Sequence, residues 1–417
     1  MFDTEQLRKK VERALVIGIE TPDMDRGEAE MLLEELEELV SNLDIAVEET
    51  KLIPIKKLNP SLLMGSGKAD EMIEHVKKQG YDCIVFDNEL SPAQQRNWEQ
   101  ASGLCVIDRQ EVILDIFGER AQTKAATLQV ELARLEYSLP RLRRAWTHLH
   151  RQRGGAAVQR GEGETQLEMD QRMVRKQIAR VKEQLATVIK QRQTQRKQRH
   201  RIPLPTAAIV GYTNAGKSSL LKRLTESSNI KGENKLFATL DPKTRRMVLP
   251  SERTILFTDT VGFVKRLPHR LIEAFKATLE EAVVSDFLIH VIDVSNPAYE
   301  EQIQTTLEVL QELGVNTDRI LTVYNKIDRI QDAEELRMER ASHRDGCFIS
   351  THTGEGLEEL IQCIDQRLDS GTEDMRLLIP HDRYDLINQL HRAGAVMKEE
   401  AKQEGVYIHG HIPPRLR

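Results

Sequence analysis

The chain has 417 residues, of which 39% are hydrophobic and 4% aromatic, and its formal net charge is −6. This length can bury a sizeable core and predicts two or three domains. No apolar run approaches the roughly 18 residues that a membrane span needs, and the first residues lack a signal pattern. Four scattered cysteines show neither metal-ligand spacing nor a disulfide framework. We therefore expect a cytoplasmic protein with buried thiols, with peripheral membrane association as an alternative.

Residues 1–110 are expected to form an α/β domain, because apolar runs alternate with helical patterns. The expected strands cover residues 13–19, 45–55, 83–87 and 105–108, and the expected helices cover 28–43 and 67–79. This alternation predicts a parallel sheet. The run Gly65-Ser66-Gly67-Lys68 lacks the spacing of a phosphate-binding loop, and the start of a helix explains its glycines.

Residues 111–200 are expected to form two helices joined by a loop, which makes an antiparallel hairpin arm. Apolar residues recur at steps of three, four or seven within residues 128–142 and 167–188. An ordinary core-facing stripe and a coiled-coil arm both fit this pattern, and both are helical. Pro140 is expected to kink or end the first helix.

Charge is distributed very unevenly along the chain. Residues 20–50 contain 12 acidic residues and one basic residue, whereas residues 141–201 contain 17 Lys/Arg and 5 Asp/Glu, about +12. A concentrated positive surface on an acidic protein indicates a polyanionic partner, and RNA is our hypothesis. The loop at 151–164 combines four glycines with Arg151, Arg153 and Arg160, which are the candidate RNA contacts. The alternative is a solvated loop that contacts nothing.

The stretch from Gly211 to Ser218 fits the phosphate-binding pattern Gly-x4-Gly-Lys-Ser/Thr. An expected strand, 206–210, precedes it, and an expected helix follows. Lys217 is predicted to contact the β and γ phosphates, and the Ser218 hydroxyl to hold Mg²⁺. Asn214 is predicted either to bind K⁺ or only to stabilise the loop. The predicted phosphate contacts are Gly211, Tyr212, Thr213, Asn214, Ala215, Gly216, Lys217, Ser218, Ser219 and Gly262.

The run Asn325-Lys326-Ile327-Asp328 matches the guanine-recognition motif Asn-Lys-x-Asp, about 110 residues after the phosphate loop. The Asp328 carboxylate can accept two hydrogen bonds from guanine, and adenine offers no such pair of donors. Lys326 is expected to pack on the base, and Asn325 to brace the loop. Ser350 and Thr351 are predicted to form the loop that contacts the guanine carbonyl.

Two switch segments are expected between these motifs. The first contains Thr239, a candidate Mg²⁺ ligand, and the second contains Asp259, which is expected to hold Mg²⁺ through water. Phe263 stands where many GTPases place a glutamine that orients the attacking water, so unassisted hydrolysis should be slow. The predicted switch residues are Phe237, Ala238, Thr239, Leu240, Asp259, Thr260, Val261, Gly262 and Phe263.

These motifs place a GTPase domain at 201–370, with a mixed, mostly parallel sheet. Residues 371–417 are expected to form a small α+β unit with a strand at 375–379, a helix at about 383–404 and a strand at 405–409.

Several strings together resemble the HflX family of ribosome-associated GTPases, which is related to the Obg group. They are LSPAQQRN at 90–97, VIDR at 106–109, LQVELA at 128–133, GEGETQLE at 161–168, GYTNAGKS at 211–218, FATLDP at 237–242 and DTVGF at 259–263. The sequence departs from the family at Thr351, where Ala is usual, and at Glu162, where Pro is more often found.

The motifs predict an enzyme that hydrolyses GTP to GDP with Mg²⁺, and we expect a monomer. The resemblance implies that it binds the large ribosomal subunit. It further implies that the arm contacts ribosomal RNA near the peptidyl-transferase region, and that the protein splits or rescues stalled ribosomes. A GTPase that acts in tRNA modification or ribosome assembly is the alternative. A membrane-coupled GTPase is disfavoured by the missing span.

Overall fold

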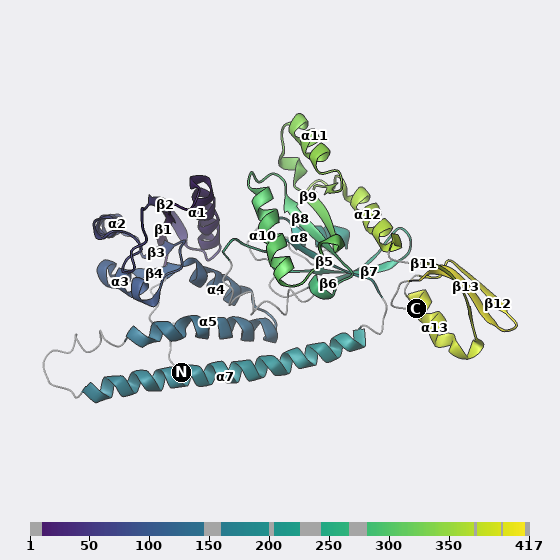
Figure 1. Ribbon diagram of the computed structural model, residues 1–417, viewed down its shortest axis with the longest axis horizontal. Coiled ribbons are helices and arrows are strands. Elements are labelled where there is room, and N and C mark those ends of the chain that lie inside the picture. Colours follow the sequence, from purple (N-terminus) through teal and green to yellow (C-terminus); the bar gives the residue numbers. More distant parts are fainter. Residues whose placement is uncertain are drawn as a thin grey trace. The chain divides into compact units, whose positions relative to one another are not determined.

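The computed structural model describes residues 11–145, 160–199, 204–225, 243–266, 282–370, 373–392 and 395–412. Among these residues one compact unit ends at Leu185, and a second begins at Ala186. Each unit contains its own parallel-dominated sheet (Figure 1). The fold class expected from the sequence, an α/β protein with a helical arm, is confirmed.

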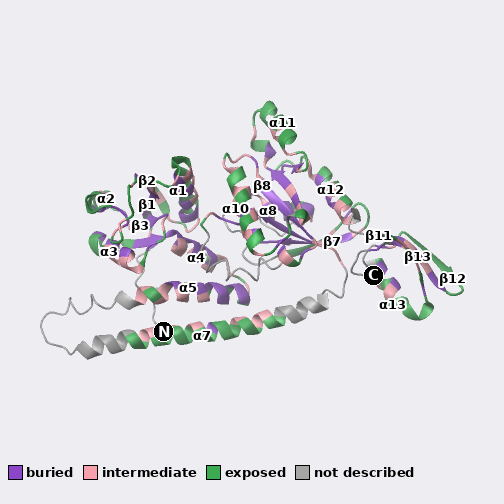
Figure 2. Ribbon diagram, viewed as in Figure 1, coloured by how far each residue is buried: buried purple, intermediate pink, exposed green. Residues whose placement is uncertain are grey.

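The first unit contains a four-stranded sheet in the order β2-β1-β3-β4, and every neighbouring pair is parallel. Its elements are β1 (Arg13–Glu20), α1 (Arg26–Ser41), β2 (Ala46–Pro54), α2 (Ser66–Gln79), β3 (Cys83–Phe86), α3 (Pro92–Ser102), β4 (Cys105–Asp108) and α4 (Arg109–Arg120). Strands β1 and β3 lie in the middle of the sheet and are almost entirely buried (Figure 2). This burial explains their continuous apolar sequences.

Local capping sets where several helices of this unit begin. The Asp25 side chain caps α1, and Ser91 and Gln94 form a reciprocal capping box at the start of α3. Gly65 precedes α2, so the glycine-rich run there is a helix start, as the sequence predicted.

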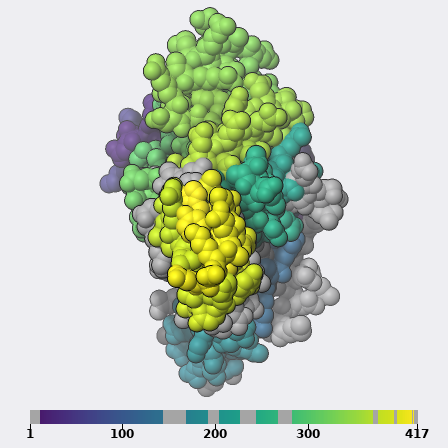
Figure 3. All heavy atoms as spheres, turned by 90° about the vertical axis from the view of Figure 1, so that its right-hand side faces the viewer, coloured from purple at the N-terminus to yellow at the C-terminus, as the bar shows by residue number. Residues whose placement is uncertain are grey.

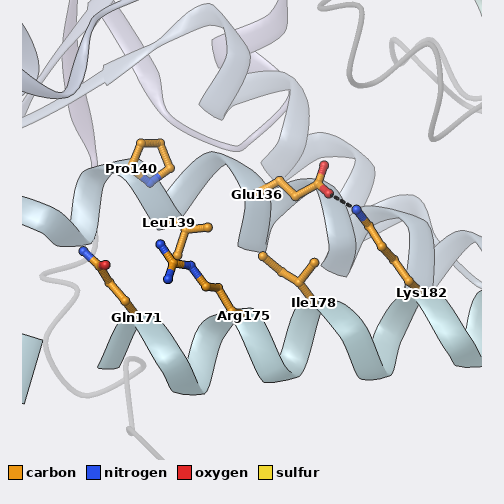
Figure 4. Close-up of a pocket in the computed structure, with 7 residues that line it drawn as sticks. All are labelled: Glu136, Leu139, Pro140, Gln171, Arg175, Ile178 and Lys182. Atoms are coloured by element: carbon orange, nitrogen blue, oxygen red, sulfur yellow. Dashed lines mark ion pairs between the residues drawn. The ribbon is translucent and has the colours of Figure 1, made fainter. Parts of the chain in front are cut away.

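The arm consists of α5 (Lys124–Ala145) and α7 (Arg160–Arg199). Within the first unit, Glu136 of α5 pairs with Lys182 of α7 at 2.8 Å, and Val181 of the predicted apolar stripe is buried. Helix α5 continues past Pro140 to Ala145, so the proline does not end the helix. A groove of about 550 Å³ lies between the two helices (Figure 4). It is lined by Glu136, Leu139, Pro140, Gln171, Arg175, Ile178 and Lys182.

The second unit contains a six-stranded sheet in the order β10-β9-β8-β5-β7-β6. Its strands are β5 (Thr206–Gly211), β6 (Lys243–Val248), β7 (Thr254–Asp259), β8 (Phe287–Asp293), β9 (Ile320–Asn325) and β10 (Cys347–Phe348). Strand β6 pairs antiparallel with β7, and the other neighbours are parallel. The helices are α8 (Lys217–Leu224), α10 (Tyr299–Glu312), α11 (Ala333–Ser342) and α12 (Leu357–Ser370).

The chain after α12 forms a three-stranded antiparallel sheet in the order β11-β13-β12. Its elements are β11 (Glu373–Ile379), α13 (Tyr384–Arg392), β12 (Lys398–Lys402) and β13 (Gly405–Ile412). Their atoms are yellow in Figure 3, and Ile387, Leu390 and Ile408 are buried between them.

The helix predicted for 383–404 is wrong in its second half, because Lys398–Lys402 forms the edge strand β12. This segment is rich in Lys and Glu, which favour helices. Pairing with β13 over Lys398–His409 to Lys402–Gly405 overrides that local preference.

A buried ionic cluster holds α1 and α4 against the end of β3. Arg109 is 2% exposed and donates to Asp87 at 2.8 Å, to Glu35 at 2.6 Å and to the Leu32 carbonyl at 2.7 Å. Burial opposes the charge of Arg109, yet its two carboxylate partners hold its pKa above the usual value. The guanidinium therefore compensates the buried Asp87 and the largely buried Glu35.

We expect Arg109→Met to lower the unfolding free energy of the first unit by about 3–5 kcal/mol, because it leaves buried carboxylates uncompensated. Urea unfolding followed by the fluorescence of buried Trp98 would measure the loss. Arg134→Met is the matched control: its pair with Asp115 at 2.8 Å is half-exposed, so its removal should change stability by about 1 kcal/mol or less. Equal losses for the two variants would contradict the expectation.

Candidate functional site

The loop from Gly211 to Ser218 connects β5 to α8, as the sequence predicted. Two of its glycines are required by their surroundings. At Gly211 the φ angle is +146° and a Cβ would lie 2.2 Å from the Val291 carbonyl oxygen. At Gly216 the φ angle is +99° and a Cβ would lie 2.2 Å from the Asn325 amide nitrogen. A side chain at either position would clash and strain the backbone.

Lys217 lies inside this loop and is buried. Its ammonium group donates to the Tyr212 carbonyl at 2.6 Å. Burial lowers its pKa to about 8, and the nearby Asp259 carboxylate acts in the opposite direction. A buried ammonium next to a glycine-lined loop is suited to bind an anionic ligand.

The Ser218 hydroxyl donates to Asp259 at 2.6 Å, so the two predicted Mg²⁺-binding side chains lie together. Ser218 lies in the first turn of α8 and Asp259 ends β7, and oxygen atoms of this kind are the ligands that Mg²⁺ prefers. This donor set fits Mg²⁺, while the identity of the ion remains a prediction. The third predicted ligand, Thr239, and its neighbours Phe237, Ala238 and Leu240 lie outside the described residues.

The residues predicted to recognise the base converge on the same end of the sheet. Asn325 is fully buried; its amide donates to the Ala215 carbonyl at 2.8 Å and accepts from the Thr351 amide at 3.0 Å. The Ser350 hydroxyl donates to Asp328 at 2.5 Å. Phosphate loop, Asn-Lys-x-Asp motif and Ser350–Thr351 loop are thus joined by hydrogen bonds within one unit.

Three other predicted residues have definite positions. Lys326 has a φ angle of +68°, and its amine pairs with Asp293 at 2.6 Å. Asn214 is exposed with a φ angle of +60°, and its role in K⁺ binding remains a prediction. Ser219 lies in the first turn of α8.

The segment after Asp259 lies directly beside the phosphate loop. A Cβ at Gly262 would lie 3.0 Å from the Lys217 amine, so this glycine is where a γ-phosphate sensor is expected. Val261 and Phe263 are buried, and the Thr260 hydroxyl donates to the Ile209 carbonyl at 2.7 Å. The Phe263 ring is a packing group and offers no hydrogen bond to a water molecule.

Sequence reasoning missed two residues of this region. Asp293, at the end of β8, fixes the Lys326 amine, and its position after an apolar strand was the available signal. His290 lies within β8, is 2% exposed and pairs in register with Val210 and Thr322. Burial, followed by the charge of Lys217, lowers the His290 pKa to about 4. A single histidine in an apolar strand gave no sequence signal.

The three arginines predicted to contact RNA lie before α7 or at its first residue, and their contact with RNA stays a prediction. Arg151 and Arg153 lie outside the described residues, and Arg160 begins α7 without a described side chain. Further along α7, six basic side chains are exposed, and the exposed acids there are Glu168 and Glu183. The six are Arg172, Arg175, Lys176, Arg180, Lys182 and Lys190. Among the described residues no helix is long and apolar enough to cross a membrane.

Three family models match the chain: "GTP-binding GTPase N-terminal" at 30–118, "GTP-binding GTPase Middle Region" at 120–199 and "50S ribosome-binding GTPase" at 206–326. The GTPase HflX of Akkermansia muciniphila is 46% identical, covering 99% of this chain and 97% of the relative. That of Lacrimispora saccharolytica is 41% identical, with 100% and 97% covered, and that of Escherichia coli is 39% identical, with 94% and 92% covered.

Among solved structures, a GTP-binding protein from Sulfolobus solfataricus in complex with GDP is 25% identical. The match covers 85% of this chain and 98% of that one, with a TM-score of 0.45.

The buried His290 predicts a specific acid sensitivity. Because its pKa is about 4 in the folded protein and about 6.5 when unfolded, its contribution to stability is complete above pH 6.5 and is lost as pH falls toward 4. Between pH 7 and pH 5 the unfolding free energy of the parent, measured with denaturant, should fall by about 2 kcal/mol more than that of His290→Leu. The same substitution at exposed His352 controls for the loss of an imidazole. Parallel pH curves for parent and His290→Leu would refute this assignment.

Proposed function

Because the chain belongs to the HflX family of GTPases, we propose that it is a GTP-controlled factor that binds the large ribosomal subunit and splits or rescues stalled ribosomes. Family membership makes it a GTP-hydrolysing enzyme that binds GTP and GDP. The observation that carries the ribosomal part is the set of exposed basic side chains along α7, a helix that begins at Arg160, within the Arg/Gly loop expected at 151–164. The description of the model matched at 206–326 supports the same partner.

We propose that the phosphate loop holds the nucleotide through its backbone N–H groups and Lys217. Lys217 would exchange the Tyr212 carbonyl for phosphate oxygens, which restores a favourable partner to its buried charge. Ser218 and Asp259 would hold Mg²⁺, with Thr239 added from the first switch. When bound, the ion supplies positive charge that offsets the phosphate oxygens.

Base selection is assigned to Asp328, supported by its hydrogen bond from Ser350. One carboxylate oxygen accepts the Ser350 hydroxyl, and guanine can donate to the remaining acceptor sites. Lys326, held by Asp293, would cover the base. Thr351 takes part through its backbone, so its difference from the family's Ala leaves the Asn325 contact in place.

We propose a separate role for each of four parts of the chain. Residues 1–110 would support the arm at 111–200, the arm would contact ribosomal RNA, residues 201–370 would bind and hydrolyse GTP, and 371–417 would form a separate small unit. Because Phe263 cannot orient water, we propose that the ribosomal subunit supplies or positions the missing group.

We expect Asp328→Asn to shift nucleotide preference from GTP toward xanthosine triphosphate. The asparagine oxygen can still accept from Ser350, while its amide can donate to the extra xanthine carbonyl. GTP affinity should fall on the order of 10²-fold or more, since a polar group in the base pocket loses its partners. Competition against a fluorescent nucleotide measures both affinities. Asp332→Asn, at the cap of α11, is the control, and retained GTP preference in Asp328→Asn would remove this residue from base recognition.

Replacing Arg151, Arg153 and Arg160 together with Ala should weaken binding to large ribosomal subunits and reduce their stimulation of GTP hydrolysis, with GTP affinity unchanged. Because phosphate contacts release counterions, the variant's binding should also depend less steeply on salt. Sedimentation with subunits at several salt concentrations measures both quantities.

The matched control removes the same charge from exposed arginines elsewhere: Arg245, Arg337 and Arg344. If both triple variants bind subunits alike, the arm has no special role. Tight binding of tRNA and none of subunits would instead favour a tRNA-modification role.

A further inference from the structure

Strand β7 pairs with β5, and the segment that follows β7 forms a second pairing with the phosphate loop. Within the sheet Ile209 is the register partner of Asp259, and beyond it Tyr212 forms a parallel bridge with Phe263. Tyr212 follows Ile209 by three residues, whereas Phe263 follows Asp259 by four. The segment after β7 therefore has one extra residue between the two pairings. The Thr260 hydroxyl satisfies the Ile209 carbonyl at 2.7 Å across this irregularity.

Gly262 lies in this irregular stretch and packs closely against the phosphate loop. A Cβ there would lie 2.9 Å from the Thr213 methyl group and 3.0 Å from the Lys217 amine. The backbone on the far side is fixed: Phe263 N–H donates to the Gly211 carbonyl at 3.1 Å, and Thr213 N–H donates to the Phe263 carbonyl at 2.8 Å. The position of Gly262 is therefore set by the bridge that follows it.

Tyr212 closes this arrangement with its side chain. Its hydroxyl accepts the Lys265 backbone N–H at 2.7 Å, and its carbonyl accepts the Lys217 ammonium at 2.6 Å. Tyr212 is 6% exposed. Phe263 and Val264, which precede Lys265 in the chain, are each 2% exposed. One residue of the phosphate loop thus contacts both the phosphate-binding lysine and the end of the second switch segment.

We propose that the Tyr212 hydroxyl is a positioning group for GTP hydrolysis, which fixes the path of residues 262–265 so that the Gly262 amide stays beside Lys217. This inference rests on the proposed assignment of the phosphate loop and adds a residue that the Gly-x4-Gly-Lys-Ser/Thr pattern leaves unspecified. This part-buried hydrogen bond ties the Lys265 backbone to the phosphate loop, so its loss removes a restraint on the path of the segment.

The ion pair between the Lys265 amine and Glu301 of α10 is a separate contact at the same point. Glu301 is more than half exposed, so the pair is open to water and contributes little to holding the segment. The backbone contact to Tyr212 is the one shielded by the neighbouring buried side chains. The hydroxyl, rather than the lysine side chain, is therefore the group to remove.

The test is Tyr212→Phe in the full chain, which keeps the ring and deletes one acceptor. We expect kcat to fall about fivefold, the equivalent of one hydrogen bond, while KM and the affinities for GTP and GDP stay within about twofold of the parent. Amide hydrogen exchange at 263–265 should become faster. Tyr299→Phe is the matched control, because it deletes a 2.8 Å hydroxyl contact to Glu339 in the same unit away from the phosphate loop.

An unchanged kcat in Tyr212→Phe, or an equal fall in Tyr299→Phe, would overturn the proposal. A parallel loss of GDP affinity would also do so, because it would show that the hydroxyl only maintains the loop. If the variant fails to fold, exchange in the parent decides: the Lys265 amide must be protected, and exchange at the rate of an exposed loop refutes the contact. Failure of the parent itself to bind GTP would instead overturn the proposed function.

Discussion

The side-chain amide of Asn325 makes two hydrogen bonds on which the geometry of the nucleotide site depends. It donates to the Ala215 carbonyl of the phosphate loop and accepts from the backbone of Thr351 in the base loop. The amide is fully buried, so either bond, if broken, would leave a polar group away from water. This requirement also explains Gly216, because the Asn325 nitrogen occupies the space that a Cβ would need. One side chain at the end of β9 therefore ties the phosphate loop to the Ser350–Thr351 loop.

Around this amide the site is built from the carboxyl ends of parallel strands. Asp259 ends β7, Asp293 ends β8 and Asn325 ends β9, so three polar side chains meet at one edge of the sheet. Such an edge is where open α/β sheets bind their ligands. Lys217 and Lys326 place positive charge over this row, each with an oxygen partner close by. The second unit thus brings positive charge and polar side chains together at this edge, as the proposed nucleotide site requires.

The sequence predicted the parts of this site that depend on spacing, and it missed those that depend on three-dimensional neighbours. The phosphate loop and the Asn-Lys-x-Asp run could be found because glycine, lysine and aspartate are needed at fixed intervals. The Tyr212 hydroxyl could not, since its partner is the backbone of Lys265, 53 residues away. Strand β12 was mistaken for helix because local preference was the available evidence, and pairing with β13 decided its structure. The ionic cluster at Arg109 likewise joins residues far apart in the chain.

The end of β4 in the first unit anchors helix α5 of the arm through the Asp108 carboxylate. Asp108 is completely buried, and its carboxylate accepts from Leu90 N–H at 3.0 Å, Glu111 N–H at 3.0 Å and the Tyr137 hydroxyl at 3.0 Å. Arg141 reaches the same carboxylate at 3.4 Å and stacks 3.4 Å from the Tyr137 ring centre. Helix α5 is about 33 Å long and is held to the sheet near its C-terminal end by Tyr137 and Arg141. Displacing α5 would therefore require breaking the hydrogen bonds that Tyr137 and Arg141 make to the buried Asp108 carboxylate, together with the contacts of α5 with α3 and α4.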